Sequence, residues 1–281
     1  MTQTIKKLFQ AIILLFLLIP AVSNAFTVTY QPAEPRQGDV LFVKIVTENA
    51  GSAEAEFQGK KYSFGRVDQK HLIALLPIDI YTSAKEYDLQ VVHNGAKSVV
   101  NIKVHAREFD TIELTLPEGK VDLSPDSHKR AAKESVMLKK VWESESERTW
   151  NTRFERPINT EISTHFGTKR IMNKKRTSVH RGMDFRGKTG TPVQAINNGT
   201  VILTDDLFFG GNTVVLDHGM GLYSVYMHLS KFTVTSGDII NKGQEIGLIG
   251  NSGRATGPHL HLSVKLHGTS VDPLSLIDLD L

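Results

Sequence analysis

Two histidines near the end of the chain have a type and spacing that could do chemistry. They are His259 and His261, in the run Gly257-Pro-His-Leu-His-Leu-Ser-Val264. The run is rich in strand-forming residues, and residues i and i+2 of a strand point to the same face of a sheet. We therefore expect both imidazoles in one pocket, where neutral imidazole is the usual nitrogen ligand for zinc. A His-x-His pair is common by chance, so a metal site needs partners elsewhere in the chain.

Candidate partners lie upstream. His180 precedes Asp184 by four residues, and His228 follows a run of strand-forming residues. A catalytic zinc takes three protein ligands and leaves one position for water, whose pKa it lowers to about 7. One such set is His180, Asp184 and His261, which leaves His228 and His259 to move protons or to stabilise charge on a carbonyl oxygen. These residues predict a zinc hydrolase, but spacing alone leaves open which histidines bind metal.

The C-terminal part, residues 151–281, must position these side chains. It has few helix signals and many glycines between short runs of β-branched and aromatic residues. This pattern predicts a compact antiparallel sheet with tight turns. The predicted strands are 192–196, 199–203, 212–217, 222–227, 245–249 and 261–266.

The N-terminal part, residues 26–108, shows about seven short strands with turn residues such as Gly59 and Asn94-Gly95 between them. Strands at this spacing predict a small β-sandwich of immunoglobulin-like type. The predicted strands are 26–30, 40–46, 53–57, 60–64, 71–76, 87–92 and 98–104. We expect its histidines, His71, His93 and His105, to be ordinary strand or surface residues.

A connecting segment, residues 109–150, joins the two parts. Ser124 can act as the N-cap of a helix with Pro125 at its first position, and the helix is predicted over 124–148. Its stripe of apolar residues is narrow, and most of its other residues are charged or polar. This pattern indicates a solvent-exposed helix that packs one face against a domain. The predicted fold class is therefore mainly β: an N-terminal β-sandwich, a connecting helix and a C-terminal antiparallel β-sheet domain.

The first 25 residues differ from the rest of the 281-residue chain. Lys6 and Lys7 precede a mostly apolar run, and Ser23-Asn-Ala25 offers small residues for cleavage before Phe26. We interpret residues 1–25 as a cleaved secretory signal peptide, with no stable membrane anchor and no lipid-bearing cysteine afterwards. Its removal lowers the formal net charge from +3 to +1, which gives no case for a nucleic-acid partner. The expected location is periplasmic or secreted.

The segment from about residue 154 to 276 resembles the M23 (lysostaphin or LytM-type) zinc endopeptidases that cut peptidoglycan peptides. The upstream part also resembles the N-terminal module of some Gram-negative members. The resemblance rests on ordered motifs: Thr164-His-Phe-Gly-Thr-Lys-Arg170, His180-x3-Asp184, Gly190-Thr-Pro-Val193, Gly199-Thr-Val201, Gly211-Asn-Thr-Val-Val-Leu-Asp-His-Gly219, Tyr226-Met-His-Leu-Ser230, Gly237-Asp238, Gly243-Gln244, Ile249-Gly-Asn-Ser-Gly253 and Thr256-Gly-Pro-His-Leu-His261.

The resemblance implies a role for each site residue. It assigns Zn²⁺ to His180, Asp184 and His261, and it places His228 and His259 beside the water and the scissile carbonyl, without saying which is the base. Many members have an aromatic residue where this chain has Leu262, which we expect to alter packing of the groove rather than chemistry. The implied substrate is the peptidoglycan stem peptide, with the D-Ala–diaminopimelate cross-link as the bond cut and protein activators unknown.

Two other functions remain open on the sequence. One is a non-catalytic regulator that binds cell wall or activates an amidase, against which the complete ligand set argues. The other is a latent enzyme whose groove is covered by the N-terminal module or by residues 171–179.

Several other residues near the motifs have more than one interpretation. His165 could line the groove, His218 is expected in a turn, and His267 is expected to be exposed. Seven basic residues stand against one acid between Lys169 and Arg186. They are expected in a loop on the groove wall, which either steers substrate carboxylates or is simply solvated.

Overall fold

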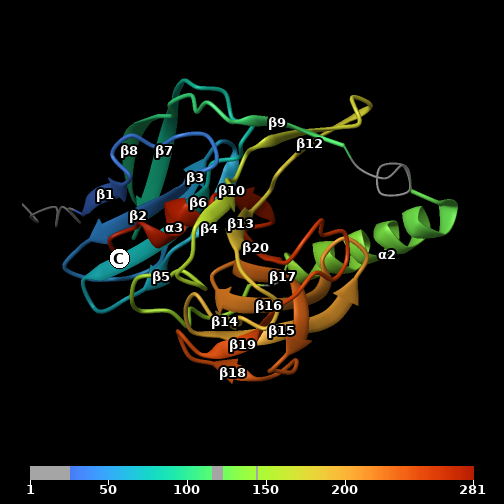
Figure 1. Cartoon of the computed structure of the whole chain (residues 1–281). Coiled ribbons are helices and arrows are strands. Elements are labelled where there is room, and N and C mark those ends of the chain that lie inside the picture. The colour runs from blue at the N-terminus through green and yellow to red at the C-terminus, as the bar shows by residue number, and fades with distance from the viewer. Residues whose placement is uncertain (1–25, 116–122, 144) are drawn as a thin grey trace, which may run out of the picture.

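The computed structural model describes residues 26–115, 123–143 and 145–281, so the predicted signal peptide lies outside the described residues. Strands dominate it, with two helices among the described residues, as the mainly β prediction requires (Figure 1). The elements are β1 (Thr27–Gln31), β2 (Val40–Val46), β3 (Ala53–Phe57), β4 (Lys60–Ser63), β5 (Gly65–Arg66), β6 (His71–Pro77), β7 (Glu86–His93), β8 (Ala96–Lys103), β9 (Thr111–Leu114), α2 (Pro125–Val141), β10 (Ile162–Thr164), β11 (Lys169–Met172), β12 (Arg176–Val179), β13 (Met183–Arg186), β14 (Pro192–Gln194), β15 (Gly199–Leu207), β16 (Gly211–Gly219), β17 (Leu222–Phe232), β18 (Ile239–Ile240), β19 (Glu245–Ile249), β20 (His259–Leu266), β21 (Thr269–Val271) and α3 (Pro273–Ile277).

The N-terminal module consists of two four-stranded sheets, ordered β1-β2-β6-β5 and β4-β3-β7-β8. Apolar side chains of both sheets meet in one buried core, for example Leu41 and Leu76 from the first sheet and Phe57 and Leu89 from the second. Alternate residues of each strand point to opposite faces, so one face of each sheet supplies this core. The module is therefore a β-sandwich, as its strand pattern predicts.

The C-terminal sheet has ten strands, with a main path ordered β10-β13-β20-β17-β16-β15-β18. Strand β20 lies in the middle, paired antiparallel with β13 on one side and β17 on the other. On one face of β20 the residues Leu260, Leu262, Val264 and Leu266 are fully buried in the core. The period of two in a strand then places His259 and His261 on the opposite face. The core thus fixes the orientation of the two histidines.

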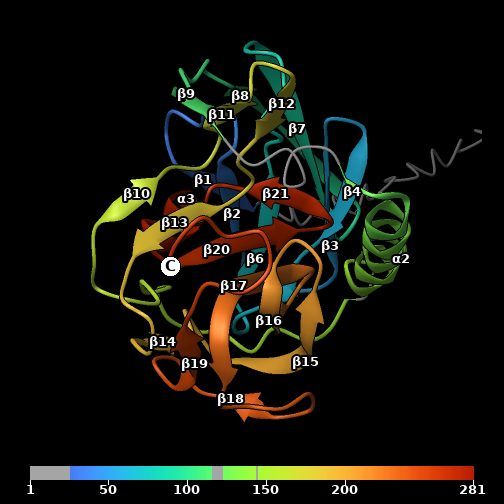
Figure 2. The same cartoon turned by 45° about the vertical axis from the view of Figure 1, so that its right-hand side comes forward.

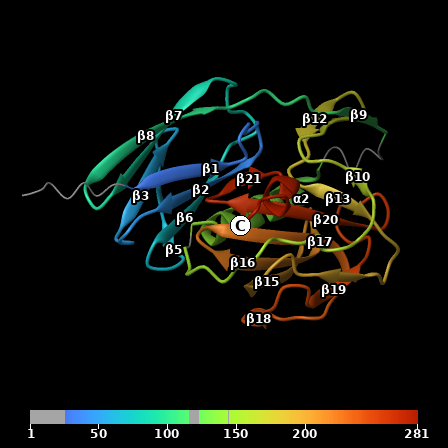
Figure 3. The same cartoon turned by 90° about the vertical axis from the view of Figure 1, so that its left-hand side faces the viewer.

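The two parts share a core where they meet. Val40, Phe42, Ile73 and Leu75 lie on the second face of the β1-β2-β6-β5 sheet and are buried in the same cluster as the core of the C-terminal sheet. Figure 3 shows the two parts side by side, with β21 and the C-terminus between them. The first sheet of the sandwich is therefore a middle layer, buried on both faces.

The connecting segment and the basic segment differ from their predictions. Residues 169–179 form a hairpin of β11 and β12 rather than a loop, and β9 from the connector extends it by pairing parallel with β11. Helix α2 starts at Pro125 behind the Ser124 cap as predicted, but it ends at Val141 instead of 148. Residues 143–148 contain no apolar side chain that could continue its stripe. None of the described helices has the length and apolarity to cross a bilayer.

Candidate metal centre and groove

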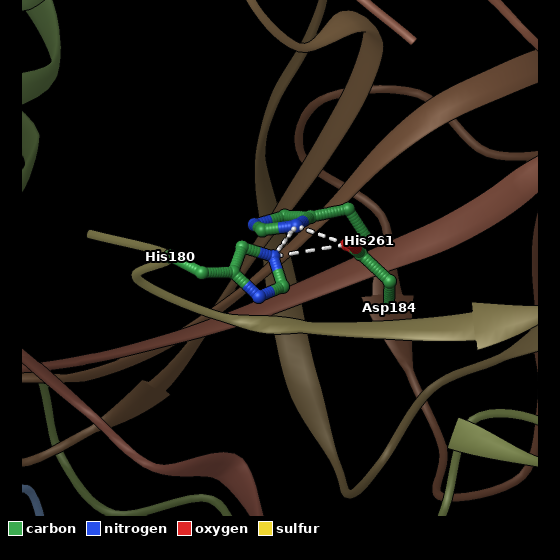
Figure 4. Close-up of side chains that lie close together, drawn as sticks. All are labelled: His180, Asp184 and His261. Carbon is green, nitrogen blue, oxygen red and sulfur yellow. Dashed lines mark hydrogen bonds and ion pairs between the residues drawn. The ribbon is translucent and has the colours of Figure 1, made fainter. Parts of the chain in front are cut away.

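Three ligand-type side chains converge on one face of the C-terminal sheet (Figure 4). His180 follows β12, Asp184 lies in β13 and His261 lies in β20, where Asp184 and His261 are register partners. The Nε2 atom of His180 lies 3.0 Å from Oδ1 of Asp184 and 2.9 Å from Nδ1 of His261, and that Nδ1 lies 2.7 Å from the same Oδ1. Strand pairing brings together residues that are far apart in the sequence.

The outer hydrogen bonds of the two histidines fix which ring nitrogen carries the proton. His180 donates from Nδ1 to the carbonyl of His165 at 2.9 Å, so its Nε2 presents a lone pair. The Ser263 hydroxyl donates to the carbonyl of Arg181 and therefore accepts from Nε2 of His261, whose Nδ1 presents a lone pair. Two nitrogen lone pairs and a carboxylate oxygen then point at one another. Such a set repels itself unless a cation lies between, so these residues fit a divalent metal ion.

Asp184 is held as a carboxylate by its surroundings. Its second oxygen, Oδ2, accepts a hydrogen bond of 2.6 Å from Arg170 of β11. Arg170 therefore leaves Oδ1 free to face the two histidines.

His228 and His259 form a second pair beside the three ligands. Their ring centroids lie 4.7 Å apart, and the centroid of His228 lies 6.0 Å from that of His261. His228 donates from Nδ1 to the carbonyl of Ser252 at 2.9 Å, and His259 donates from Nδ1 to the carbonyl of Gly257 at 2.8 Å. In the neutral ring this leaves Nε2 of each histidine able to accept a proton.

His228 sits in an unusual local environment. Its backbone φ is +65°, a left-handed conformation that is uncommon for a residue other than glycine. Burial, with the neighbouring His261 and His259, lowers its pKa to about 4, so the ring is neutral at pH 7. The surrounding structure thus holds a neutral histidine in a strained position beside the ligands.

Two cavities meet at this site. One of about 830 Å³ is lined by residues of the 160–164 and 186–191 segments, and one of about 530 Å³ is lined by β11, β12 and the histidines. Thr164, Asp184, Thr256 and His259 line both cavities. Ile112 and Leu114 of β9 also line the second one, so the connector contributes to its wall. The candidate metal centre lies between the two arms of one groove, which could hold an extended chain on both sides.

Part of the chain is similar to known proteins. The model of Peptidase family M23 matches residues 178–273. Peptidoglycan DD-endopeptidase ShyA of Vibrio cholerae is 41% identical over 114 residues, which are 40% of this chain and 26% of ShyA. DD-carboxypeptidase/endopeptidase Mpg of Neisseria meningitidis is 34% identical over 119 residues, which are 42% of this chain and 27% of Mpg. The matched region thus spans about a quarter of the length of these curated relatives.

A solved structure extends the comparison to both parts of the chain. A Pseudomonas aeruginosa protein described as a peptidase M23 is 29% identical with a TM-score of 0.68, over 87% of this chain and 95% of that chain. Residues 178–273 form a domain of peptidase family M23. The resemblance stated from the sequence motifs is confirmed, and the M23 match includes all five candidate site residues within 178–273.

The structure brings all five candidate residues of the M23 domain together, and it separates the other histidines from them. The His165 side chain is exposed, and only its carbonyl contacts the site, through His180. His218 is fully buried in β16 rather than placed in a turn, because Asn198 and Ser224 satisfy both ring nitrogens. His267 is half-buried against the Tyr62 ring at 5.0 Å, so the prediction that it is exposed is wrong.

Two supporting residues were not singled out from the sequence of this M23 peptidase domain. Ser263 fixes the proton on His261, and Arg170 orients Asp184. Ser263 could have been found as the next residue on the His259 and His261 face of the strand. Arg170 was counted only as one charge of the basic segment, and its pairing joins the β11–β12 hairpin to Asp184 of β13.

Proposed function

We propose that this protein is a zinc-dependent endopeptidase that hydrolyses peptide cross-links of bacterial peptidoglycan. The observation that carries the proposal is the convergence of three lone-pair atoms beside two further histidines at the meeting point of two cavities. Relatives named peptidoglycan DD-endopeptidases support the substrate class. The D-Ala–diaminopimelate bond is the cross-link that we propose as its target.

His180, Asp184 and His261 would hold the ion. A set of two histidines and one aspartate, with no cysteine in the chain, leaves a fourth position open and suits zinc. Zinc bound there would polarise the scissile carbonyl and make hydroxide available at neutral pH. Arg170 would keep Asp184 oriented, and Ser263 and the carbonyl of His165 would keep both histidines in the ligating tautomer.

His228 and His259 would move the proton. Each directs Nδ1–H to a backbone carbonyl, so each ring is fixed in orientation with Nε2 available. One Nε2 accepts a proton as water attacks the carbonyl carbon, and the protonated ring then stabilises the oxyanion or gives the proton to the leaving amine. The ring centroids of the two histidines are 4.7 Å apart. Either ring can therefore accept the proton from water or donate it to the leaving amine.

The two arms of the groove would hold the peptide on either side of the scissile bond. Arg170, Arg181 and Arg254 line the smaller arm of the groove. Among the described residues, Asp184 is the only acidic residue in this lining. Stem peptides carry free carboxylates, which such an arm attracts. We propose the division into signal peptide 1–25, module 26–108, connector 109–150 and peptidase domain 151–281, with action outside the cytoplasm.

The decisive experiment uses purified protein, its His261→Ala variant and a matched His128→Ala control on the exposed part of α2. We expect soluble muropeptides from isolated sacculi with the wild type and the control, and none after chelation or with His261→Ala. The variant should also lose its stoichiometric zinc, measured by elemental analysis. His228→Ala and His259→Ala should keep the metal but lower kcat about 10²- to 10⁴-fold. Release of muropeptides that depends on neither zinc nor His261 would overturn the proposal, and no release by the wild type would favour a non-catalytic regulator.

A further inference from the structure

The face of β20 that carries the two site histidines continues beyond the candidate metal centre. The period of two adds Ser263 and Lys265 to the row that begins with His259 and His261. Lys265 is the register partner of Tyr223 in β17 and of Ser270 in β21. The side chains of Lys265 and Ser270 therefore lie on the same face, a few ångströms apart at their Cβ atoms.

Helix α2 runs beside the C-terminal sheet (Figures 1 and 2), and its residues line one side of a cavity over this part of the face. Its N-terminal half is held by Arg130, which contacts Asp206 at 3.3 Å, and by Glu134, which accepts the N–H of Phe208 at 2.8 Å. Its C-terminal end is held by the Trp142 ring, 5.2 Å from that of Tyr223. No residue of α2 is buried. Between helix and sheet lies a cavity of about 510 Å³.

The walls of this cavity are mostly apolar, with cations and an unpaired hydroxyl at the sheet side. Leu138, Trp142, Val225 and Met227 supply much of the apolar wall. Ser270 also lines the cavity, is 2% exposed, and its Oγ has no hydrogen-bond partner in the part of the chain that the structure describes. A buried hydroxyl without a partner costs free energy, so an occupant that bonds it is favoured.

The charge in the cavity is positive and uncompensated. Burial and the nearby Arg181 lower the pKa of Lys265 to about 8, and Asp79 opposes them only weakly. The Lys265 side chain has no hydrogen bond or ion pair among the described residues. The acid in the described lining is Glu134, whose two oxygens already accept from Arg130 and from the Phe208 N–H. An anion that enters would therefore meet Lys265 with no unpaired carboxylate in the described lining of the cavity.

We propose that the cavity under α2 binds a carboxylate carried on an apolar body, with the carboxylate on Lys265 and Ser270 and the body against α2. Its volume lies within the range of sites for small organic ligands. A carboxylate paired with a partly buried lysine gains more than in water, because the surroundings are apolar. An inorganic anion would leave the apolar wall without a partner, so the proposed ligand class is an organic carboxylate.

The carboxylate could come from either of two sources. Arg181, Phe209, Met227 and His261 line both this cavity and the smaller arm of the groove. A peptide in the groove could therefore extend its own carboxylate under α2, a version that rests on the proposed function. A separate small carboxylate could equally occupy the cavity, close to Ser263 and the His261 that it orients.

The binding test compares octanoate with 1-octanol on the full protein by isothermal titration calorimetry. We expect octanoate to bind about tenfold more tightly, the factor typical of a hydrogen bond to a charged group. Lys265→Met and Ser270→Ala should reduce this preference. Lys140→Met, on α2 but outside the cavity lining, should keep it. Lys265→Gln repeats the test if Lys265→Met does not fold. Equal affinities, no octanoate binding, or an unchanged preference in both Lys265 variants would overturn the proposal.

Hydrolysis of a soluble cross-linked muropeptide then distinguishes the sources. If the carboxylate belongs to the substrate, octanoate competes with it and Lys265→Met raises KM about tenfold with little change in kcat. If it belongs to a separate molecule, Lys265→Met leaves KM unchanged while octanoate binding is still lost. The calorimetric test needs no turnover, so its failure is distinct from failure of the proposed endopeptidase activity.

Discussion

The N-terminal module and the connecting helix each contact the C-terminal sheet, and the two contacts differ in packing. At the first, the β1-β2-β6-β5 sheet lays Val40, Phe42, Ile73 and Leu75 directly into the core of the C-terminal sheet. At the second, α2 spans the sheet on a few end contacts above a cavity of about 510 Å³. The first contact is a continuous apolar core, whereas the second encloses a cavity.

This difference assigns different mechanical properties to the two places. A shared core transmits strain and does not slide without exposing apolar area, so the sandwich and the peptidase sheet should move as one body. A helix without buried residues is stabilised by little tertiary contact and can open locally at low cost. Any opening of the groove from this side should therefore begin at α2 and leave the sandwich in place.

The largest effect is expected from breaking the shared core. Phe42→Ala should lower the free energy of unfolding by about 3–5 kcal/mol, because it removes a buried ring between two layers. Leu41→Ala, one residue earlier on the face toward the sandwich, should cost a similar amount. Both variants should melt in one transition by calorimetry. A separate early transition in Leu41→Ala alone would mean that the sandwich unfolds independently, contrary to the shared-core interpretation.

A pH effect of similar size should come from His218, where the chain after α2 rejoins the core. Thr149 donates its N–H to the His218 carbonyl at 3.0 Å, and burial lowers the pKa of the His218 ring to about 4. Between pH 6.5 and 4 the unfolded chain binds a proton that the folded chain excludes. Stability should therefore fall by about 3 kcal/mol as pH falls through this window. Denaturant melts of wild type and His218→Gln would measure it, and an equal slope in both would contradict the assignment.

A smaller effect is expected at the ion pairs that close the junction. Arg107 lies 3.0 Å from Asp272 and 3.4 Å from Asp39, two mostly buried carboxylates whose pKa values burial raises. Arg107→Met should cost about 2 kcal/mol at pH 7, since Arg107 is itself a quarter exposed. The loss should shrink toward pH 4 as the carboxylates take up protons. Arg107→Lys keeps the charge and should lose less, and equal losses at both pH values would exclude the electrostatic cause.

The sequence predicts much of the fold but not the junction. The alternating strands and the turn residues predict a sandwich and an antiparallel sheet, and most strands lie within a few residues of the expected positions. Strands β2 and β6 read as almost continuous apolar runs, which indicates burial on both faces. That signal was available, but which second surface they meet depends on long-range packing that no local pattern carries.

The candidate site divides in the same way. His259 and His261 share a face because of the strand period, and motifs supply His180, Asp184 and His228 as partners. What spacing could not give is the tautomer of each ring, because it depends on the carbonyls of His165, Ser252 and Gly257 and on Ser263. The wall that β9 adds to the groove was also missed, since four residues of a connector carry no strong strand signal.

The smallest effect on global stability, and the sharpest test of the comparison, is expected at the N-cap of α2. The Ser124 hydroxyl accepts the N–H of Ser127 at 3.2 Å, and Ser124→Ala should cost the helix about 1 kcal/mol. Because α2 is lightly held, this cost should increase the fraction of time that the helix is open and should leave the melting temperature almost unchanged. Hydrogen exchange should then become about fivefold faster in 125–141 and stay unchanged in β2 and β6. Slower or unchanged exchange in α2, or a drop in melting temperature as large as that of Phe42→Ala, would show that the helix is integral to the core after all.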